Sequence, residues 1–390
     1  MRARGGVRAR PSSRPLALAL ALASAAAATA AGPSYVSASS PLVLWGGRPS
    51  LPLADGAVAF DWQSTAAFLS VSGVGSSITL FANLTGPARV SVYVNGYDAA
   101  NLMLSNASSS YLLAAAMPDA VNSVEVRYSF EPVYSQADAA AGRTPSFFGF
   151  AAGAGGSFLP PTPLARRIDI VGDSISAGGM YDKLQAVNGA LSLNDGCHPW
   201  SPATGMSDAF NWHHYLCRFF SANCTNTAWS GKGLIHNSGC SQGPLMPQLY
   251  TQAFATDAAQ PWDFSRAARP DAVIVYLGTN DYSCNLTTDA RFTAAAVAFF
   301  HNVTAYYAAS PPPPSGAPIH FFAAVGLMSP TRPLAAVKAA IAQANADGLR
   351  ASFLDMTNAT ADGCGGHPGP IGHWQMALQA APQIKAAMAW

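Results

Sequence analysis

Three short motifs contain the residue types that hydrolyse an ester. Gly172-Asp173-Ser174 and Gly278-Thr279-Asn280-Asp281 each follow an apolar run, and Gly366-His367-Pro368 lies near the C-terminus. Ester hydrolysis needs a nucleophile, a base that takes its proton, and donors that stabilise the oxyanion. Ser174, His367 and Asn280 can fill these roles in turn. Taken singly, each motif also fits an ordinary turn, because serine, aspartate and asparagine are common turn residues.

Ser174 is the candidate nucleophile. The run 168–171 before it indicates a short buried strand. A hydroxyl just past the C-terminal end of a parallel strand lies where open α/β sheets bind ligands. The residue two positions later is Ser176 and not glycine, so the G-x-S-x-G elbow of the α/β-hydrolases is not indicated.

In this order, the three motifs resemble those of the SGNH (GDSL) hydrolases, and the resemblance covers most of residues 166–390. It implies a flavodoxin-like, three-layer α/β domain with a parallel sheet. The stretch 229–234 resembles the second block of the family, although a glycine pair after a strand is by itself more often a turn. The resemblance assigns the oxyanion hole to the backbone amides of Ser174 and Gly231 and to the side-chain amide of Asn280.

The base and its orienting group are less closely specified. The resemblance favours His367 over His373, because His373 lies where the family begins the helix after its catalytic His-Pro. Family members usually carry an aspartate three residues before the histidine, and that position is Cys364 here. Asp362 is out of register by two residues. We therefore expect a Ser174–His367 dyad whose imidazole is oriented by a backbone carbonyl, with Asp362 or water as alternatives.

The hydrophobic patterns predict two regions. Valines alternate with other residues over 90–94 and end at Asn95-Gly96, a strong hairpin signal, and 78–84 and 124–130 alternate likewise. These patterns predict an antiparallel, jelly-roll-like β-sandwich at about 35–150, followed by a Gly/Pro-rich linker at 153–163.

Strands and helices alternate in the second region, residues 164–390, and this predicts a parallel sheet covered on both faces. The expected strands are 168–172, 226–229, 272–278, 318–325 and 351–355. The expected helices are near 206–220, 288–309, 332–347 and 372–388.

A β-sandwich before a GDS-type hydrolase domain resembles the carbohydrate esterases of family 2, secreted deacetylases of plant polysaccharides. The resemblance implies an acetylated oligo- or polysaccharide substrate. A GDSL lipase or thioesterase and a non-catalytic carbohydrate-binding protein are the alternatives. The histidines show no HExxH pattern, so neither a metal nor another cofactor is expected. Trp200, Trp212 and Trp374 could stack on sugars, but we expect at least two of them in the core or an interface.

The low net charge argues against some classes of binding partner, and the N-terminal residues indicate the cellular compartment. The 390 residues are 50% hydrophobic and 11% charged, and the net charge of +1 argues against nucleic acid or an acidic membrane surface. Residues 1–31 combine scattered arginines, the apolar run 16–28 and small residues, which predicts a signal peptide and secretion; a transit peptide is the alternative. No later run reaches the ~18 apolar residues of a membrane span. The sequence does not indicate an oligomeric state.

The six cysteines, all within 197–364, favour disulfides in a secreted chain. We predict Cys217 with Cys224, Cys197 with Cys240, and Cys284 with Cys364, so that the last bond would join the loops of Asn280 and His367. Six sequons are compatible with a glycosylated surface: Asn83, Asn106, Asn223, Asn285, Asn302 and Asn358.

Overall fold

The structure is a computed structural model that describes residues 34–84, 88–132, 144–179, 184–187, 190–193, 208–328 and 332–390. The described elements belong to one compact unit, Gly32–Trp390. The predicted signal peptide, Cys197 and Trp200 lie outside the described residues.

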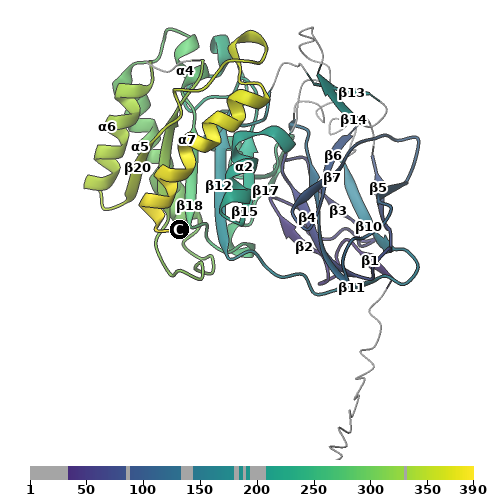
Figure 1. Cartoon of the computed structure of the whole chain (residues 1–390). Coiled ribbons are helices and arrows are strands. Elements are labelled where there is room, and N and C mark those ends of the chain that lie inside the picture. Colours follow the sequence, from purple (N-terminus) through teal and green to yellow (C-terminus); the bar gives the residue numbers. More distant parts are fainter. Residues whose placement is uncertain are drawn as a thin grey trace, which may run out of the picture. The chain divides into compact units, whose positions relative to one another are not determined.

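Two antiparallel sheets form the first region (Figure 1). The first contains, in spatial order, β1 (Tyr35–Ser37), β10 (Ser146–Ala152), β5 (Ile78–Asn83) and β8 (Ser110–Ala114), with β3 (Val58–Ala59) beside β10. The second contains β11 (Ser157–Leu159), β4 (Ala66–Ser72), β9 (Val121–Tyr128), β6 (Ala88–Val94) and β7 (Tyr97–Leu104), with β2 (Leu44–Gly46) beside β4. This arrangement confirms the predicted antiparallel architecture.

Alternating side chains build the core of this region. Ile78, Leu80 and Ala82 of β5 are at most 1% exposed and pack in a cluster formed by residues of both sheets. The predicted hairpin joins β6 to β7, and Asn95 and Gly96 there have φ of 53° and 79°. Asparagine and glycine tolerate positive φ better than other residues, which explains why this pair makes the turn. β11 extends the antiparallel sheets into the stretch predicted as a linker.

A five-stranded parallel sheet forms the second region. Its spatial order is β15 (Ala222–Ala228), β12 (Arg166–Gly172), β18 (Ala272–Tyr276), β19 (His320–Val325) and β20 (Arg350–Asp355). Numbered within this sheet, the strands run 2-1-3-4-5, the flavodoxin-like order in which ligands bind at the switch point between strands 1 and 3. The C-terminal ends of β12 and β18 border that point, and they carry the Gly-Asp-Ser and Gly-Thr-Asn-Asp motifs.

Helices cover both faces of this sheet (Figure 1). Ile274 of β18 packs in the cluster that contains α2 (Trp212–Phe219) and α7 (Pro370–Met388). Its neighbours Val273 and Val275 pack in the cluster that contains α5 (Asp289–Tyr306) and α6 (Leu334–Ala346). Because strand residues alternate between faces, apolar residues at successive positions require cover on both sides. The predicted three-layer α/β arrangement is therefore confirmed.

Shorter elements complete the described chain. They are β13 (Leu184–Val187), β14 (Ala190–Leu193), β16 (Gln252–Phe254), β17 (Asp257–Pro261), α3 (Met246–Leu249) and α4 (Thr279–Ser283), with single 3₁₀ turns at Asp208–Phe210, Ser238–Cys240, Phe264–Arg266 and Cys364–Gly366.

Buried polar contacts join the two regions. Asp61, between β3 and β4, accepts hydrogen bonds from the amides of Ala255 and Thr256 at 2.9 and 3.0 Å, in the turn between β16 and β17. The adjacent Trp62 is fully buried and belongs to the cluster that contains α5 and α6. The antiparallel region thus contributes side chains to the packed interior of the α/β region.

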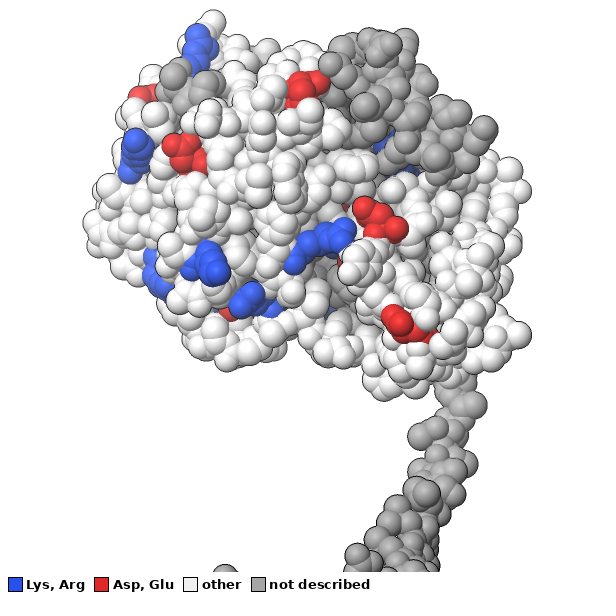
Figure 2. All heavy atoms as spheres, in the orientation of Figure 1, with Lys and Arg blue, Asp and Glu red and all other residues white. Residues whose placement is uncertain are grey.

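The surface in Figure 2 carries few charges, and the Lys, Arg, Asp and Glu side chains on this face are scattered and form no single large patch. Within the described part of the chain, no helix has both the length and the apolar character that crossing a bilayer requires.

Candidate active site

Ser174 and His367 lie together, although 193 positions separate them in the chain. The Oγ of Ser174 is 2.8 Å from Nε2 of His367, and the two residues are only 6% and 5% exposed. Ser174 lies in the turn that follows β12, which is closed by hydrogen bonds from the amide of Ala177 to the carbonyl of Asp173 and from Gly179 to Ser174, both 2.8 Å. This geometry allows the imidazole to take the serine proton.

The imidazole of His367 is held in a mostly buried setting just before α7. Burial lowers its pKa to about 4, and hydrogen bonds with the backbone carbonyls of Cys364 and Gly365 act in the opposite direction. The ring is therefore neutral near pH 7, the state that a general base needs. The two carbonyls belong to the 3₁₀ turn Cys364–Gly366, which directly precedes the histidine.

Asp362 lies at the N-terminus of α7. Its carboxylate accepts hydrogen bonds from the amides of Gly369, Ile371 and Gly372 at 2.8, 3.0 and 2.8 Å. The first amides of a helix have no partner within it, and a carboxylate there satisfies them and favours the helix dipole. The geometry therefore assigns this carboxylate to capping the helix.

Gly231 and Asn280 follow the strands on either side of β12. Gly231 has φ of +78°, a conformation that favours glycine, and Asn280 lies in α4. Among the described residues, nothing accepts a hydrogen bond from the backbone amide of Ser174 or Gly231. The side-chain nitrogen of Asn280 donates to the carbonyl of Lys232 at 2.8 Å and to the carboxyl of Asp173 at 3.4 Å. All three predicted donors thus come from the C-terminal ends of neighbouring strands.

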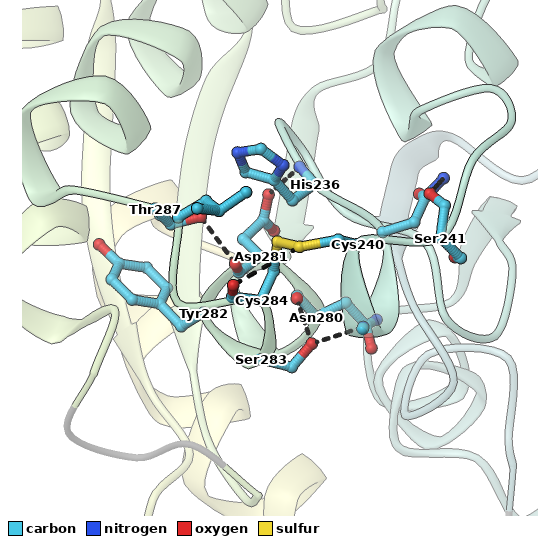
Figure 3. Close-up of a disulfide and its surroundings, with 12 residues drawn as sticks. His236, Cys240, Ser241, Asn280, Asp281, Tyr282, Ser283, Cys284 and Thr287 are labelled. Carbon is cyan, nitrogen blue, oxygen red and sulfur yellow. Dashed lines mark hydrogen bonds between the residues drawn. A yellow bond between two sulfur atoms is a disulfide. The ribbon is translucent and has the colours of Figure 1, made fainter.

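Asp281 ties α4 to the segment 229–236, which we call the Gly231 loop. Its carboxylate accepts hydrogen bonds from the amides of Leu234, Ile235 and His236 at 3.1, 2.6 and 3.0 Å. Figure 3 shows His236 and Asp281 side by side. Sequence analysis did not assign this role, although Asp281 stands in the motif that was singled out. The signal for this role in the sequence was the position of Asp281, directly after the asparagine that follows a predicted strand.

A disulfide joins Cys240 to Cys284 beside the same contact (Figure 3). The predicted bond between Cys217 and Cys224 is confirmed. The predicted pairs of Cys240 with Cys197 and of Cys284 with Cys364 are wrong, because Cys240 and Cys284 bond to each other. The physical reason is that hydrogen bonds to Asp281 hold the segment after Gly231 against α4. The Cα atoms of the two cysteines are then 5.1 Å apart. Cys364 is also disulfide-bonded.

Buried polar side chains hold the turn that contains Ser174 by bonding to the carbonyl of Ser176. The carbonyl of Ser176 accepts hydrogen bonds from Asn211 Nδ2 at 2.7 Å, Asn226 Nδ2 at 2.9 Å and His213 Nε2 at 3.0 Å. Burial lowers the pKa of His213 to about 3, so it acts as a neutral donor. Sequence analysis missed these three residues, because each is distant in sequence from Ser176 and has no recognisable motif.

The other candidates lie in different environments. His373 is fully buried in α7, and its Nδ1 accepts a hydrogen bond from the amide of Trp212 at 3.3 Å. Trp212 itself is fully buried, whereas Trp374 is 40% exposed and packs edge-on against Tyr215 and Phe219. Trp200 lies outside the described residues. Within the described chain, no group of three His, Cys, Asp or Glu side chains is arranged to hold a metal ion.

Comparison with known proteins gives one family and several structural relatives. The family model described as GDSL-like Lipase/Acylhydrolase matches residues 168–379. The curated relative "Cellulase/esterase CelE" of Acetivibrio thermocellus is 33% identical over 149 residues, which are 38% of this chain but only 17% of that protein.

Two solved structures share the fold over most of this chain. A carbohydrate esterase family 2 enzyme with a carbohydrate binding domain from Corynascus thermopiles (Myceliophthora fergusii) is 26% identical, with a TM-score of 0.67 over 89% of this chain and 100% of that chain. A family two carbohydrate esterase from Clostridium thermocellum, in complex with cellohexaose, is 23% identical, with a TM-score of 0.71 over 89% of this chain and 99% of that chain. The second likeness concerns the fold alone.

Proposed function

The chain belongs to the GDSL-like lipase/acylhydrolase family, and on that premise we propose that it is a secreted serine esterase that removes acetyl groups from acetylated carbohydrates. The observation that carries the proposal is the 2.8 Å contact between Ser174 Oγ and His367 Nε2 at the switch point of the parallel sheet. The likeness to family 2 carbohydrate esterases across both regions supports a carbohydrate acetyl ester as the substrate.

The proposed reaction is a two-step acyl transfer. His367 Nε2 takes the proton of Ser174 as the serine oxygen attacks the acetyl carbonyl, and the same proton then passes to the departing sugar hydroxyl. Water next attacks the acetyl-serine and gives one proton to His367, which returns it to Ser174 as acetic acid leaves with the other proton and ionises in solution. Each step conserves charge and protons, so these residues need no further reactant besides water.

The oxyanion is proposed to bind the amides of Ser174 and Gly231 and the side-chain amide of Asn280. An amide nitrogen carries two hydrogens, and that of Asn280 makes a normal bond to Lys232 but only a long one, 3.4 Å, to Asp173. The second hydrogen, which makes only the long bond to Asp173, is therefore the one available to donate to the oxyanion. Loss of one such donor typically lowers turnover by ~10²–10³.

The orienting group is proposed to be the backbone. Nδ1 of His367 lies beside Gly365, and the backbone carbonyls of Cys364 and Gly365 oppose the lowering of the pKa of the imidazole, while Asp362 is engaged by the amides of α7. Such a dyad dispenses with the carboxylate of a Ser-His-Asp triad, whose part is to hold the ring in the correct tautomer.

The proposed setting is extracellular. Disulfides persist in oxidising compartments, and the structure contains Cys217–Cys224 and Cys240–Cys284. Five of the six sequon asparagines are exposed, whereas Asn223 lies half-buried within β15 and is a poor acceptor for a glycan. We propose glycosylation at the exposed positions only.

Titration with a serine-directed phosphonate tests the proposed function. The protein should hydrolyse p-nitrophenyl acetate and release acetate from an acetylated xylo- or cello-oligosaccharide, and one equivalent of phosphonate should label Ser174 and abolish both activities. Ser174→Ala should fold normally and be inactive, because deleting a turn hydroxyl costs little stability. Labelling at another residue, or turnover above a few per cent in Ser174→Ala, would contradict the nucleophile assignment. Preference for long acyl chains over acetyl sugars would favour the lipase alternative.

A further inference from the structure

We infer that Glu131, a residue of the antiparallel region, positions the Gly231 loop and with it the oxyanion hole; this inference rests on the proposed function. Glu131 follows β9 by three residues and is fully buried. Its Oε2 accepts a hydrogen bond of 2.8 Å from the amide of Ser230, the residue directly before Gly231. Glu131 is thus a positioning residue that acts through the loop.

Hydrogen bonds fix the backbone on both sides of Gly231, whose own amide has no acceptor among the described residues. The amide of Trp229 donates to the carbonyl of Gly172 at 3.3 Å, and that of Ser230 donates to Glu131. The carbonyls of Gly231 and Lys232 accept from the amide of Ser238 and from Asn280 Nδ2, both at 2.8 Å. These contacts fix the backbone on both sides of Gly231. Among the described residues, none accepts a hydrogen bond from the Gly231 amide itself, which therefore stays available for the oxyanion. Glu131 is the one of these anchors that comes from the antiparallel region.

Because of its backbone conformation, Gly231 needs neighbouring contacts to keep its amide in one orientation. Glycine populates positive and negative φ about equally, so Gly231, with φ of +78°, does not by itself hold the loop in one conformation. A carboxylate binds a backbone amide more strongly than a neutral acceptor does. Burial raises the pKa of Glu131 to about 7, and the hydrogen bond from Ser230 opposes this. Burying a carboxyl costs free energy, and an apolar side chain at this position would pack without that cost. The presence of Glu131 therefore points to its hydrogen bond with Ser230 and not to packing alone.

Asp61 provides a matched control. It is also a fully buried carboxyl of the antiparallel region that accepts amide hydrogen bonds from the α/β region, here from Ala255 and Thr256. Burial raises its pKa as well, to about 6. It differs from Glu131 in holding the β16–β17 turn instead of the Gly231 loop. A merely structural role of Glu131 predicts that the two carboxyls behave alike on substitution.

The experiment compares Glu131→Ala, Glu131→Asp, Glu131→Gln and Asp61→Ala in the full chain. We expect kcat on p-nitrophenyl acetate to fall about 10–100-fold in Glu131→Ala with KM changed less than about threefold, because oxyanion stabilisation acts on the transition state. The affinity for a boronic acid that forms a tetrahedral adduct with serine should fall in parallel. Glu131→Gln keeps a neutral acceptor at the same reach and should recover part of the loss, because its bond to the Ser230 amide is weaker than that of a carboxylate. Asp61→Ala should lower Tm but leave kcat of the folded fraction within about twofold.

Folded Glu131→Ala with wild-type kcat and boronate affinity would overturn the inference, as would an equal loss in Asp61→Ala. If Glu131→Ala does not fold, Glu131→Asp decides, because it keeps the charge and withdraws the carboxylate by one methylene. Wild-type kcat in that variant overturns the inference too. Ser174→Ala separates the two proposals: its activity would defeat the proposed function, whereas an inactive Ser174→Ala beside a fully active Glu131→Ala defeats this inference alone.

Discussion

The carboxylate of Asp362 accepts a hydrogen bond of 2.8 Å from the amide of Gly372, in the first turn of α7. This relationship distinguishes helix capping from the role of a triad acid, which an aspartate five residues before the proposed base could also have. The carboxylate serves the helix that begins three residues after His367, while the backbone before His367 faces the ring. The same short segment therefore lies against the ring of the proposed base and also starts the helix.

Asp362→Asn should lower kcat on an acetylated sugar less than about tenfold, whereas loss of a true triad acid costs about 10⁴. It should also lower the free energy of unfolding by roughly 0.5–2 kcal/mol, because a helix cap is weakened. Steady-state kinetics and denaturant unfolding of the same preparation check both values. A thousandfold fall in a protein that still folds would make Asp362 the third triad member.

The pH profile should report the low pKa of His367. The base acts in its neutral form, and its pKa is lowered to about 4, so kcat/KM should be lost as pH falls through about 4 and not near 6.5. Initial rates with p-nitrophenyl acetate from pH 3 to 8, with folding monitored by circular dichroism, check this. An acid limb centred near 6.5 in the folded protein would contradict the burial argument.

Gly231→Ala should lower catalytic turnover more than the same substitution at a glycine that lies shortly after the Gly231 loop. The new Cβ has room, since its nearest neighbour is Ser238 Cβ at 3.7 Å, but φ of +78° is costly for alanine by about 1–2 kcal/mol. We expect relaxation of the loop and a fall in kcat of about tenfold or more. Gly239→Ala is the control, because Gly239 also has a positive φ, 59°, and open space around it. Equal losses in the two variants would count against the oxyanion role.

Replacing Cys240 and Cys284 by serine should lower both stability and turnover. The bond closes a loop with a sequence separation of 44, and such a crosslink typically contributes about 2–4 kcal/mol. Because it joins α4 to the segment after Gly231, we also expect kcat to fall. Cys217→Ser with Cys224→Ser, which opens a bond with a separation of only 7, should leave kcat nearly unchanged. Non-reducing peptide mapping that finds Cys240 or Cys284 free would refute the pairing.

The local sequence determined the types of element and the chemistry they carry. Alternation over 78–84 and 90–94, the Asn95-Gly96 turn and the apolar run 272–277 predicted strands where the structure has β5, β6 and β18. The motifs around Ser174, Asn280 and His367 were visible because strand-end turns impose residue types within a few positions. The Cys217–Cys224 bond was predictable for the same reason, since only seven positions separate the two residues.

Tertiary structure alone decided which distant groups meet. The bond between Cys240 and Cys284, the capping role of Asp362, the three donors to Ser176 and the contact of Glu131 with Ser230 were not predicted from the sequence. Residue patterns report preferences over a strand or a helical turn, whereas these contacts depend on how whole layers dock. A buried carboxylate takes the amides that docking brings within reach, because an unpaired polar group in the interior is costly. The partner of each such group is therefore a property of the packed fold and not of its neighbours in the chain.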